Sequence, residues 1–222
     1  MDGKKRTRRQ KTNKRVEQIL LGLGDAYPNA QCTLSHKNPL ELLVATILSA
    51  QCTDERVNLV TRELFRKYRT ARDYAGVAQE VLEKDIQSTG FYRNKAKSIQ
   101  GACSMIIEKF GGSVPDSMEE LIQLPGVARK TANVVLGVAF GKANGIVVDT
   151  HVFRVSRRLD LTSSNTPEKV EHDLVQIIPK NRWISFSHQV ILHGRKICKA
   201  RKPLCLICPV EKICCSKDKI IP

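Results

Sequence analysis

Apolar positions recur every three or four residues in nearly every segment of this chain, which is the period of an amphipathic α-helix. The clearest runs are Val16, Ile19, Leu20 and Leu23; Val57, Val60, Leu64 and Tyr68; and Ala96, Ile99, Ala102, Ile106 and Phe110. No segment alternates as a half-buried strand does. Residues 146 to 148 are strand-like but too short to found a sheet, so we expect a buried extended link there. The pattern predicts an all-α fold with about ten short helices.

Residues that cap helices mark where these helices should start and stop. A capping side chain or a proline precedes three apolar runs, at Asn38-Pro39, Thr53-Asp54 and Thr166-Pro167. Ser117 and Glu120 have the spacing of a capping box. Gly111 and Gly141 follow apolar runs, where left-handed C-terminal caps are expected.

Composition places the chain among soluble proteins large enough to bury a core. Its 222 residues allow one large domain or two small ones. Hydrophobic residues make up 41% of the chain, but no apolar run approaches the length of a bilayer span. The first residues lack the apolar core of a secretory signal.

The formal charge of +15 points to a polyanionic partner. Residues 1 to 15 supply about half of it, with eight basic residues against Asp2. We expect this segment to be a basic disordered tail. It would either raise non-specific affinity for nucleic acid or simply solubilise the chain.

The most informative stretch, residues 124 to 151, combines a glycine turn, a lysine and an aspartate. Leu124-Pro125-Gly126 turns the chain between two helices, the second starting near Lys130, in a helix-hairpin-helix pattern. Amide groups at that helix start would bind a DNA phosphate without reading sequence. The helix dipole and partial burial would lower the pKa of Lys130 and make it a nucleophile. Otherwise, Lys130 is a surface lysine that touches phosphate.

Asp149 lies just before Thr150, which we expect to cap the next helix. As a catalytic group, the Asp149 carboxylate would stabilise positive charge developing at a sugar C1′ and help to deprotonate the incoming amine. As a structural group, it would be a helix cap itself.

Eight cysteines without a secretion signal favour reduced thiols or metal ligands over disulfides. Cys198, Cys205, Cys208 and Cys214 are spaced as Cys-x6-Cys-x2-Cys-x5-Cys. Four thiolates in one short loop suit a [4Fe-4S] cluster, with structural zinc as the alternative. Lys199, Arg201 and Lys202 lie between the first two ligands, where they would either contact phosphate or form a solvated basic loop. Cys215 is an extra thiol.

These residues resemble the helix-hairpin-helix DNA glycosylase superfamily and, within it, the endonuclease III family with a [4Fe-4S] cluster. The resemblance covers about residues 16 to 215, and the Cys-x6-Cys-x2-Cys-x5-Cys spacing also matches that family. It implies two helical domains with DNA bound in the cleft between them. A six-helix domain would span residues 32 to 142, with the hairpin at 117 to 140. The iron-sulfur domain would combine residues 16 to 31 with 143 to 222.

Carried over by position, the resemblance makes Lys130 the catalytic nucleophile and Asp149 the catalytic aspartate. Related adenine glycosylases usually have serine, and thymine-mismatch enzymes tyrosine, where this chain has Lys130. Lysine therefore favours a bifunctional enzyme. Two departures stand out. Ala128 replaces a second hairpin glycine, which raises the question of a left-handed conformation there. Residues 142 to 145 also form a link about one residue longer than usual.

Other parts of the resemblance concern distortion of the DNA. Gln51 would enter the gap left by an extruded base, and Phe91 would supply an apolar wedge. From the residues alone, Gln51 would be an ordinary helix-end residue and Phe91 a core aromatic. His151 is interpreted as a hydrogen-bonded packing histidine rather than a catalytic group.

The resulting hypothesis is a bifunctional glycosylase and abasic-site (AP) lyase of base excision repair. It would remove oxidised pyrimidines from duplex DNA by Schiff-base chemistry and cleave the strand by β-elimination. A mismatch-specific glycosylase and a non-catalytic iron-sulfur DNA-binding protein are the alternatives. We expect a monomer in the cytoplasm of a bacterium or archaeon, associated with the nucleoid and with no membrane partner.

Overall fold

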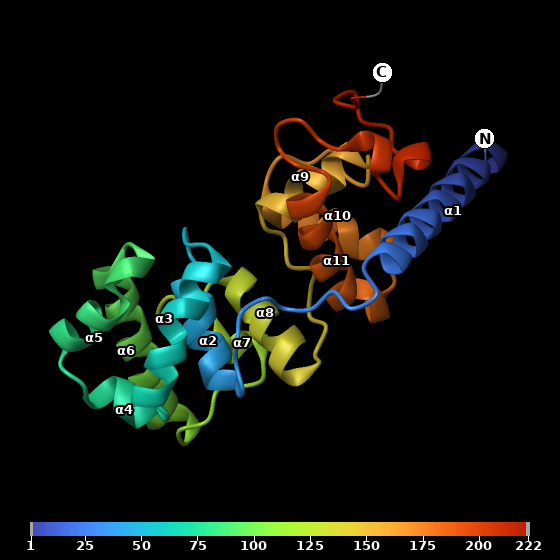
Figure 1. The fold of residues 1–222 in the computed structure, drawn as a ribbon. Coiled ribbons are helices and arrows are strands. Elements are labelled where there is room, and N and C mark those ends of the chain that lie inside the picture. The colour runs from blue at the N-terminus through green and yellow to red at the C-terminus, as the bar shows by residue number, and fades with distance from the viewer. Residues whose placement is uncertain (1, 221–222) are drawn as a thin grey trace. The chain divides into compact units, whose positions relative to one another are not determined.

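A computed structural model describes the backbone of residues 2–220 and the side chains of residues 14–220. Over residues 2–220 the regular structure is entirely helical and contains no strand, which confirms the all-α prediction. The chain divides into two compact units. Unit 1 joins Met1–Gln31 to Gly145–Pro222, and unit 2 is the continuous segment Cys32–Asn144. Both ends of the chain therefore belong to the same unit (Figure 1).

Unit 2 is a helical body built around one apolar core. Its elements are α2 (Pro39–Leu48), α3 (Asp54–Lys67), α4 (Ala71–Gly76), α5 (Gln79–Ile86), the short 3-10 helix η1 (Gln87–Thr89), α6 (Tyr92–Phe110), α7 (Met118–Leu121) and α8 (Arg129–Phe140). Helix α6 packs against α4 and α5, while α2 packs against α8. Fully buried residues such as Leu42, Ile99 and Leu136 come from three of these helices and form one cluster.

The predicted caps explain why several helices begin and end where they do. The side chains of Asn38, Thr53 and Thr166 accept hydrogen bonds from backbone amides three residues later, and Ser117 does the same for α7. Gly111 and Gly141 follow α6 and α8 with φ of 61° and 65°, in the left-handed conformation that glycine adopts at low cost. The single caps are therefore confirmed. The capping box is present only in part, because Glu120 Oε2 accepts from Ser117 Oγ rather than from the Ser117 amide.

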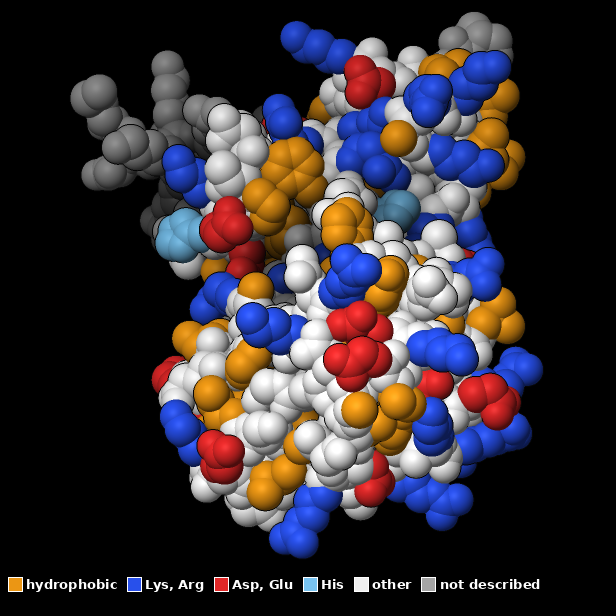
Figure 2. Space-filling view, turned by 90° about the vertical axis from the view of Figure 1, so that its left-hand side faces the viewer, with side chains coloured by type: hydrophobic (Ala, Val, Ile, Leu, Met, Phe, Trp, Pro, Cys, Tyr) orange, Lys and Arg blue, Asp and Glu red, His pale blue; other side chains and the backbone are white. Residues whose placement is uncertain are grey.

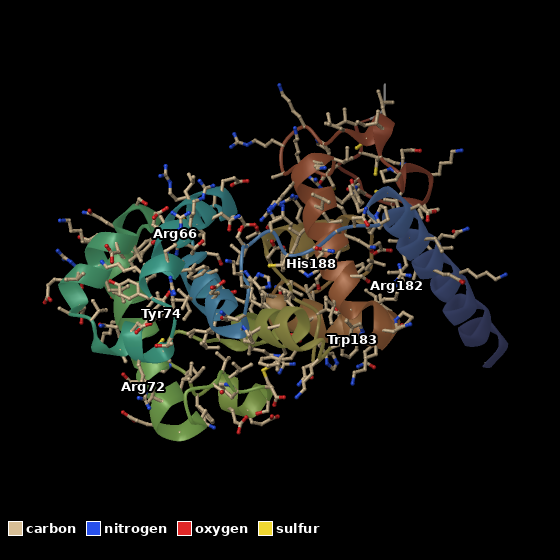
Figure 3. All side chains as sticks on the ribbon, turned by 60° about the horizontal axis from the view of Figure 1, so that its bottom comes forward. Arg66, Arg72, Tyr74, Arg182, Trp183 and His188 are labelled. Atoms are coloured by element: carbon tan, nitrogen blue, oxygen red, sulfur yellow. The ribbon has the colours of Figure 1, made fainter. Side chains whose placement is uncertain are left out.

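Unit 1 holds the two ends of the chain together. Its elements are α1 (Asp2–Ala26), α9 (Thr150–Arg158), α10 (Pro167–Ile177), η2 (Lys180–Arg182), α11 (Trp183–Lys196), η3 (Cys205–Ile207) and η4 (Glu211–Ile213). Arg182 Nη2 donates to the Leu20 carbonyl at 3.3 Å, which fastens the start of α11 to α1 (Figure 3). Ile19, Val152 and Phe186 lie fully buried in a core separate from that of unit 2.

Helix α1 begins earlier than the sequence predicts. Residues 2 to 15, expected to be a disordered tail, continue the helix of the apolar run back to Asp2. Lysine, arginine and glutamine have high helix propensity, and no proline interrupts the segment. An apolar helix that is already anchored can therefore extend through these residues. The side chains of residues 1 to 13 lie outside those described.

The link between the units has the predicted extended form. Residues 146 to 149 have no regular structure, and Ile146 and Val148 are buried in the unit 1 core. The Val147 amide donates to Ser187 Oγ on α11 at 3.1 Å. A buried link of this kind fixes the start of α9, where Asp149 lies.

The surface is consistent with the basic composition. Figure 2 shows Lys and Arg side chains spread over the visible face, with Asp and Glu in smaller groups. Within the described part of the chain, no helix is both long and apolar enough to cross a membrane.

Candidate nucleic-acid interface and active site

The turn between α7 and α8 is fixed by close packing against α6. Gly126 has φ of 76°, and a Cβ added there would come within 2.6 Å of Ser98 Cβ. One residue earlier, Pro125 packs on α6 at Gly101, where an added Cβ would lie 3.1 Å from Pro125 Cγ. Gly126 is therefore required both by its conformation and by the space available. This packing holds the start of α8 at a defined place on unit 2.

The first turn of α8 begins after an N-cap residue whose own side chain cannot cap it. Ala128 is the N-cap residue and makes no side-chain hydrogen bond to the helix. The first amides of any helix lack intrahelical acceptors, and they carry the positive end of the helix dipole. Ala128 has φ of −84° and ψ of 169°, an extended conformation that alanine adopts freely. The position therefore does not need a glycine, which answers the question raised by its replacement.

Lys130 is the second residue of α8 and its side chain is exposed. The buried residues of the helix, Ala132, Asn133, Val135 and Leu136, lie on the opposite side of the helical turn. The partial burial expected from the sequence is therefore wrong, because the apolar face of α8 is turned toward α2 and the lysine away from it. An exposed amine at this point can reach a bound substrate without breaking any packing contact of α8.

Asp149 is the N-cap of α9. Its Oδ1 accepts hydrogen bonds from the His151 amide at 2.9 Å and from the Val152 amide at 2.8 Å. Thr150, expected to be the cap, is instead the first residue of the helix. Asp149 is the cap because a carboxylate interacts more favourably with the positive end of the helix than a hydroxyl does. Both of these bonds go to Oδ1, so the cap fixes the carboxylate in place without using Oδ2.

His151 packs inside unit 1, as its sequence context predicts. Arg154 Nη2 lies 3.2 Å from His151 Nδ1, and a Cβ added to Gly194 would come within 2.9 Å of His151 Cβ. Burial lowers the pKa of His151 below its ordinary value, opposed by the charge of Asp149 and reinforced by Arg154. Gly194 on α11 therefore leaves room for the His151 side chain, which packs between α9 and α11.

Gln51 and Phe91 lie in two exposed loops of unit 2 with the same unusual backbone. Gln51 has φ of 51° and Phe91 has φ of 47°, both in the left-handed region that residues other than glycine rarely adopt. Phe91 exposes 63% of its surface, so the core-aromatic interpretation is wrong. Gln51 is exposed as well. Exposed side chains on strained backbone are typical of functional positions rather than of packing.

The four spaced cysteines gather in unit 1. Cys198, Cys205, Cys208 and Cys214 line one pocket together with residues of α9 and α11. The pKa of the Cys208 thiol is raised to about 11, mainly by burial and in smaller part by the charge of the other three cysteines. Among the described residues, no group of three or more possible ligands lies close enough together to hold a metal ion as placed. Four thiolates brought together here would repel one another unless a bound cation offset their charge. Sulfur donors and low-polarity surroundings fit a metal or cluster site.

Two arginines that the sequence reasoning missed hold the loop after Cys198. Arg158 Nη1 donates to the Lys199 carbonyl at 2.6 Å and its Nη2 donates to the Ala200 carbonyl at 3.0 Å. Arg154 Nη2 donates to the carbonyls of Gly194 at 2.9 Å and Cys198 at 3.1 Å. The donors and acceptors are about forty residues apart in the sequence, so no local pattern reveals them.

This loop exposes the three predicted phosphate contacts. Lys199, Arg201 and Lys202 are all exposed, and Lys202 has a left-handed φ of 52°. Since Arg158 fixes the loop backbone through two carbonyls, the three cations project from a defined framework. Cys215 follows the last spaced cysteine and is also exposed.

Helix-hairpin-helix geometry, an open helix end and an exposed lysine define a class of DNA repair protein. The model of the HhH-GPD superfamily of base excision DNA repair proteins matches residues 44–180. The chain belongs to this superfamily.

Within the superfamily, similar relatives of known name are endonuclease III proteins. Endonuclease III of a Synechocystis species is 56% identical over 200 residues, covering 90% of this chain and 91% of the relative. Endonuclease III of Bacillus subtilis is 50% identical over 202 residues, covering 90% of this chain and 92% of the relative.

Solved structures agree with these relatives. A non-covalent endonuclease III–DNA complex superposes with a TM-score of 0.87 at 49% identity, covering 91% of this chain and 94% of the other. A trapped endonuclease III–DNA covalent intermediate, in an estranged-adenine complex, gives the same TM-score at 50% identity, covering 91% of this chain and 95% of the other. A thermostable thymine-DNA glycosylase at 24% identity shares the fold, with a TM-score of 0.84 over 92% of this chain and 97% of the other.

Proposed function

We propose that this chain is a bifunctional DNA glycosylase and AP lyase that removes oxidised pyrimidines from duplex DNA during base excision repair. The observation that carries the proposal is Lys130, an exposed amine in the first turn of α8, next to an N-cap residue that makes no side-chain cap. Phosphate bound by those amides would place a sugar next to the amine. The likeness to a trapped endonuclease III–DNA covalent intermediate supports a covalent route.

The reaction begins at the sugar carbon that carries the damaged base. Neutral Lys130 Nζ attacks C1′, the bond from C1′ to the base breaks, and the base leaves with the bonding electrons and takes up a proton. Opening of the sugar ring gives a protonated Schiff base between Nζ and C1′. The iminium acidifies the hydrogen on C2′, and its loss expels the 3′ phosphate by β-elimination. Water then hydrolyses the Schiff base and frees the lysine.

Asp149 supports the first step. Two helix amides hold its Oδ1 and so fix the orientation of the carboxylate. Its charge stabilises the positive charge that develops at C1′ as the base departs. Its Oδ2 accepts a proton from the attacking amine.

The remaining predicted DNA contacts are of two kinds, those to the phosphate backbone and those to the bases. The amides after Gly126 and Ala128 bind backbone phosphate, as do Lys199, Arg201 and Lys202 of the arginine-held loop. Phe91 is the apolar wedge that unstacks the duplex, and Gln51 fills the space of the extruded base. Both side chains are already exposed in unit 2.

The expected six-helix domain with the hairpin would lie within unit 2, which contains the seven α-helices α2 to α8, and the cluster domain within unit 1. Cys198, Cys205, Cys208 and Cys214 would hold a [4Fe-4S] cluster, whose contribution is to cross-link the loop that carries the basic residues. A cluster of this kind belongs in a reducing compartment, so we place the protein in the cytoplasm beside the chromosome. It acts there as a monomer.

Borohydride trapping tests the chemistry directly. Duplexes carrying thymine glycol, an abasic site or a mismatch are incubated with the native protein and with Lys130→Ala, and borohydride reduces any Schiff base to a stable adduct. We expect adducts with the first two duplexes and only with the native protein. Adduct on the mismatch duplex alone would favour a mismatch enzyme. Duplex binding without any adduct would favour a non-catalytic DNA-binding protein.

Metal analysis tests the cofactor separately. Protein purified without oxygen should be yellow-brown and contain about four irons per chain. Stoichiometric zinc without iron would replace the cluster by a structural zinc site.

A further inference from the structure

The two loops that carry Gln51 and Phe91 share one buried lysine. Lys95 lies in the first turns of α6 and exposes only 5% of its surface. Its Nζ donates to the Leu48 carbonyl at 2.8 Å and to the Thr89 carbonyl at 2.8 Å. Leu48 ends α2 and Thr89 ends η1, so one ammonium group joins the ends of two different elements.

Each acceptor lies two or three residues before one of the residues with left-handed backbone. Leu48 is three residues before Gln51, and Thr89 is two residues before Phe91. The carbonyl of Leu48 is one of the last four of α2, which have no partner within the helix. A bond from Lys95 satisfies it and fixes the point where the chain leaves α2 for Gln51. The bond to Thr89 does the same for the chain that turns through Gly90 into Phe91.

Burying an ammonium group is costly unless hydrogen bonds replace its water. Burial lowers the pKa of Lys95, opposed by the charge of the nearby Cys52. Packing alone would be served better by methionine or leucine at this position, since neither carries a charge. A buried lysine that spans two loops is therefore better explained by what it positions than by core stability.

The backbone conformations point the same way. Residues other than glycine occupy the left-handed region at a cost and persist there only when the surrounding structure holds them. Gln51 and Phe91 are two of only four such residues in the described part of the chain, and Lys95 binds the segment before each of them. The helices around the two loops also pack together, since α3 contacts η1 and α2 contacts α6, but Lys95 is the side chain that bonds the ends of both α2 and η1.

We infer that Lys95 is a positioning residue that couples the Gln51 loop to the Phe91 loop, so that wedge and gap-filling side chain act on the duplex as one unit. The inference rests on the proposed function, because it assigns to Lys95 a role in the same base extrusion. It predicts that loss of the Lys95 bonds impairs extrusion and leaves the lysine chemistry at Lys130 intact.

The test compares Lys95→Met with Lys97→Met, an exposed lysine on the same helix. Two activities of the full-length, cluster-containing protein are measured: single-turnover release of thymine glycol from a duplex, and cleavage of a single-stranded oligonucleotide with an abasic site. The second needs no base extrusion. We expect Lys95→Met to slow base release roughly thirtyfold, within the loss that small misplacement of reacting groups causes. Single-strand cleavage and both activities of Lys97→Met should stay native.

A direct signal comes from 2-aminopurine placed opposite the lesion, whose fluorescence rises when it is unstacked. The native protein and Lys95→Arg, which retains a charged donor, should raise it, whereas Lys95→Met should not. A double-mutant comparison completes the test. If Lys95 acts through Phe91, Lys95→Met should cost little more in a Phe91→Ala protein. Native base release by Lys95→Met, or a fully multiplicative loss in the double variant, would overturn the inference.

The outcomes separate this inference from the proposed function. If Phe91→Ala and Gln51→Ala both release the base at the native rate, the proposed DNA contacts fail first. If those variants are slow and Lys95→Met is not, the coupling alone fails. If both Lys95→Met and the polar variant Lys95→Gln unfold below the assay temperature by circular dichroism, Lys95 is a residue of stability and the positioning role is rejected.

Discussion

The starts of α8 and α9 are two helix N-termini that treat their unpaired amides in opposite ways. At α8 the N-cap is Ala128, whose side chain has no acceptor, so the N-cap itself does not compete with an external anion for the amides. At α9 the N-cap is Asp149, whose Oδ1 accepts from two of the amides at 2.8 and 2.9 Å. The start of α8 can therefore bind an external anion, whereas the start of α9 is already capped by the Asp149 carboxylate.

The difference explains why the two candidate catalytic residues are of opposite charge. An exposed lysine beside an open helix end meets the anionic backbone of DNA, which brings the sugar to the amine. A carboxylate held by two amides is fixed in orientation, and its charge acts on the nearby Arg154. A lysine at the start of α9 would not accept the amide hydrogen bonds that Asp149 accepts. An aspartate at the start of α8 would repel the DNA phosphate. The following variants test this comparison.

The largest effect should come from removing the amine while the open helix end is kept. Lys130→Gln should reduce the rate of base release by at least about a thousandfold, the scale of loss when a nucleophile is removed. Its affinity for lesion duplex should fall only a few-fold, because the amides remain. The matched variant Arg129→Gln, one residue earlier, should weaken binding and keep the chemistry. Single-turnover rates and fluorescence anisotropy measure the two properties, and equal losses in both variants would assign Lys130 to phosphate binding.

At the capped end, Asp149→Asn separates charge from capping. Asparagine caps helices as well as aspartate does, so stability should change little. Base release should fall roughly a hundredfold to ten-thousandfold, the range expected for a group that assists proton transfer. Asp149→Ala should show the same loss of rate and also destabilise unit 1 by about 1 kcal/mol. Urea unfolding followed by the fluorescence of Trp183, the only tryptophan, measures that second effect. A native rate in Asp149→Asn would reduce Asp149 to a cap.

The two helix starts also show what sequence can and cannot predict. Caps at Asn38, Thr53 and Thr166 were predictable because each bond spans three residues. Thr150 was the wrong choice beside Asp149, since both residue types cap helices and the advantage of the carboxylate was not given enough weight. Lys95, Arg154 and Arg158 carry no local signal, because their partners lie far along the chain or depend on which side chains are buried. Phe91 was placed by resemblance, against the usual burial of aromatics.

A smaller effect should follow from closing the open end. In Ala128→Asp the new carboxylate would accept from the amides of α8, as Asp149 does in α9. We expect a gain of about 1 kcal/mol in stability and a loss of roughly tenfold in affinity for duplex, since one phosphate contact is replaced by a like charge. The slope of log affinity against log salt should become shallower by about one. Ala128→Gly is the control, because the extended conformation there requires no glycine, and it should bind as the native protein does.

The smallest effect concerns His151, which contributes one of the amides that Asp149 caps. Burial lowers the pKa of the His151 side chain in the folded protein below its ordinary value of 6.5. Below that pH the unfolded chain binds a proton that the folded chain does not, so stability is lost as the pH falls through this range. The loss contributed by His151 should be at most about 1.4 kcal/mol per pH unit. Native protein should therefore lose more stability between pH 7.5 and pH 5.5 than His151→Gln, by Trp183-monitored urea unfolding. His172→Gln, at an exposed position of α10, should behave as the native protein does.

Since the charge of Asp149 raises the pKa of His151, Asp149→Asn should lower that pKa further in an NMR titration. An unchanged pKa would mean that the capped carboxylate does not act on its own helix through space.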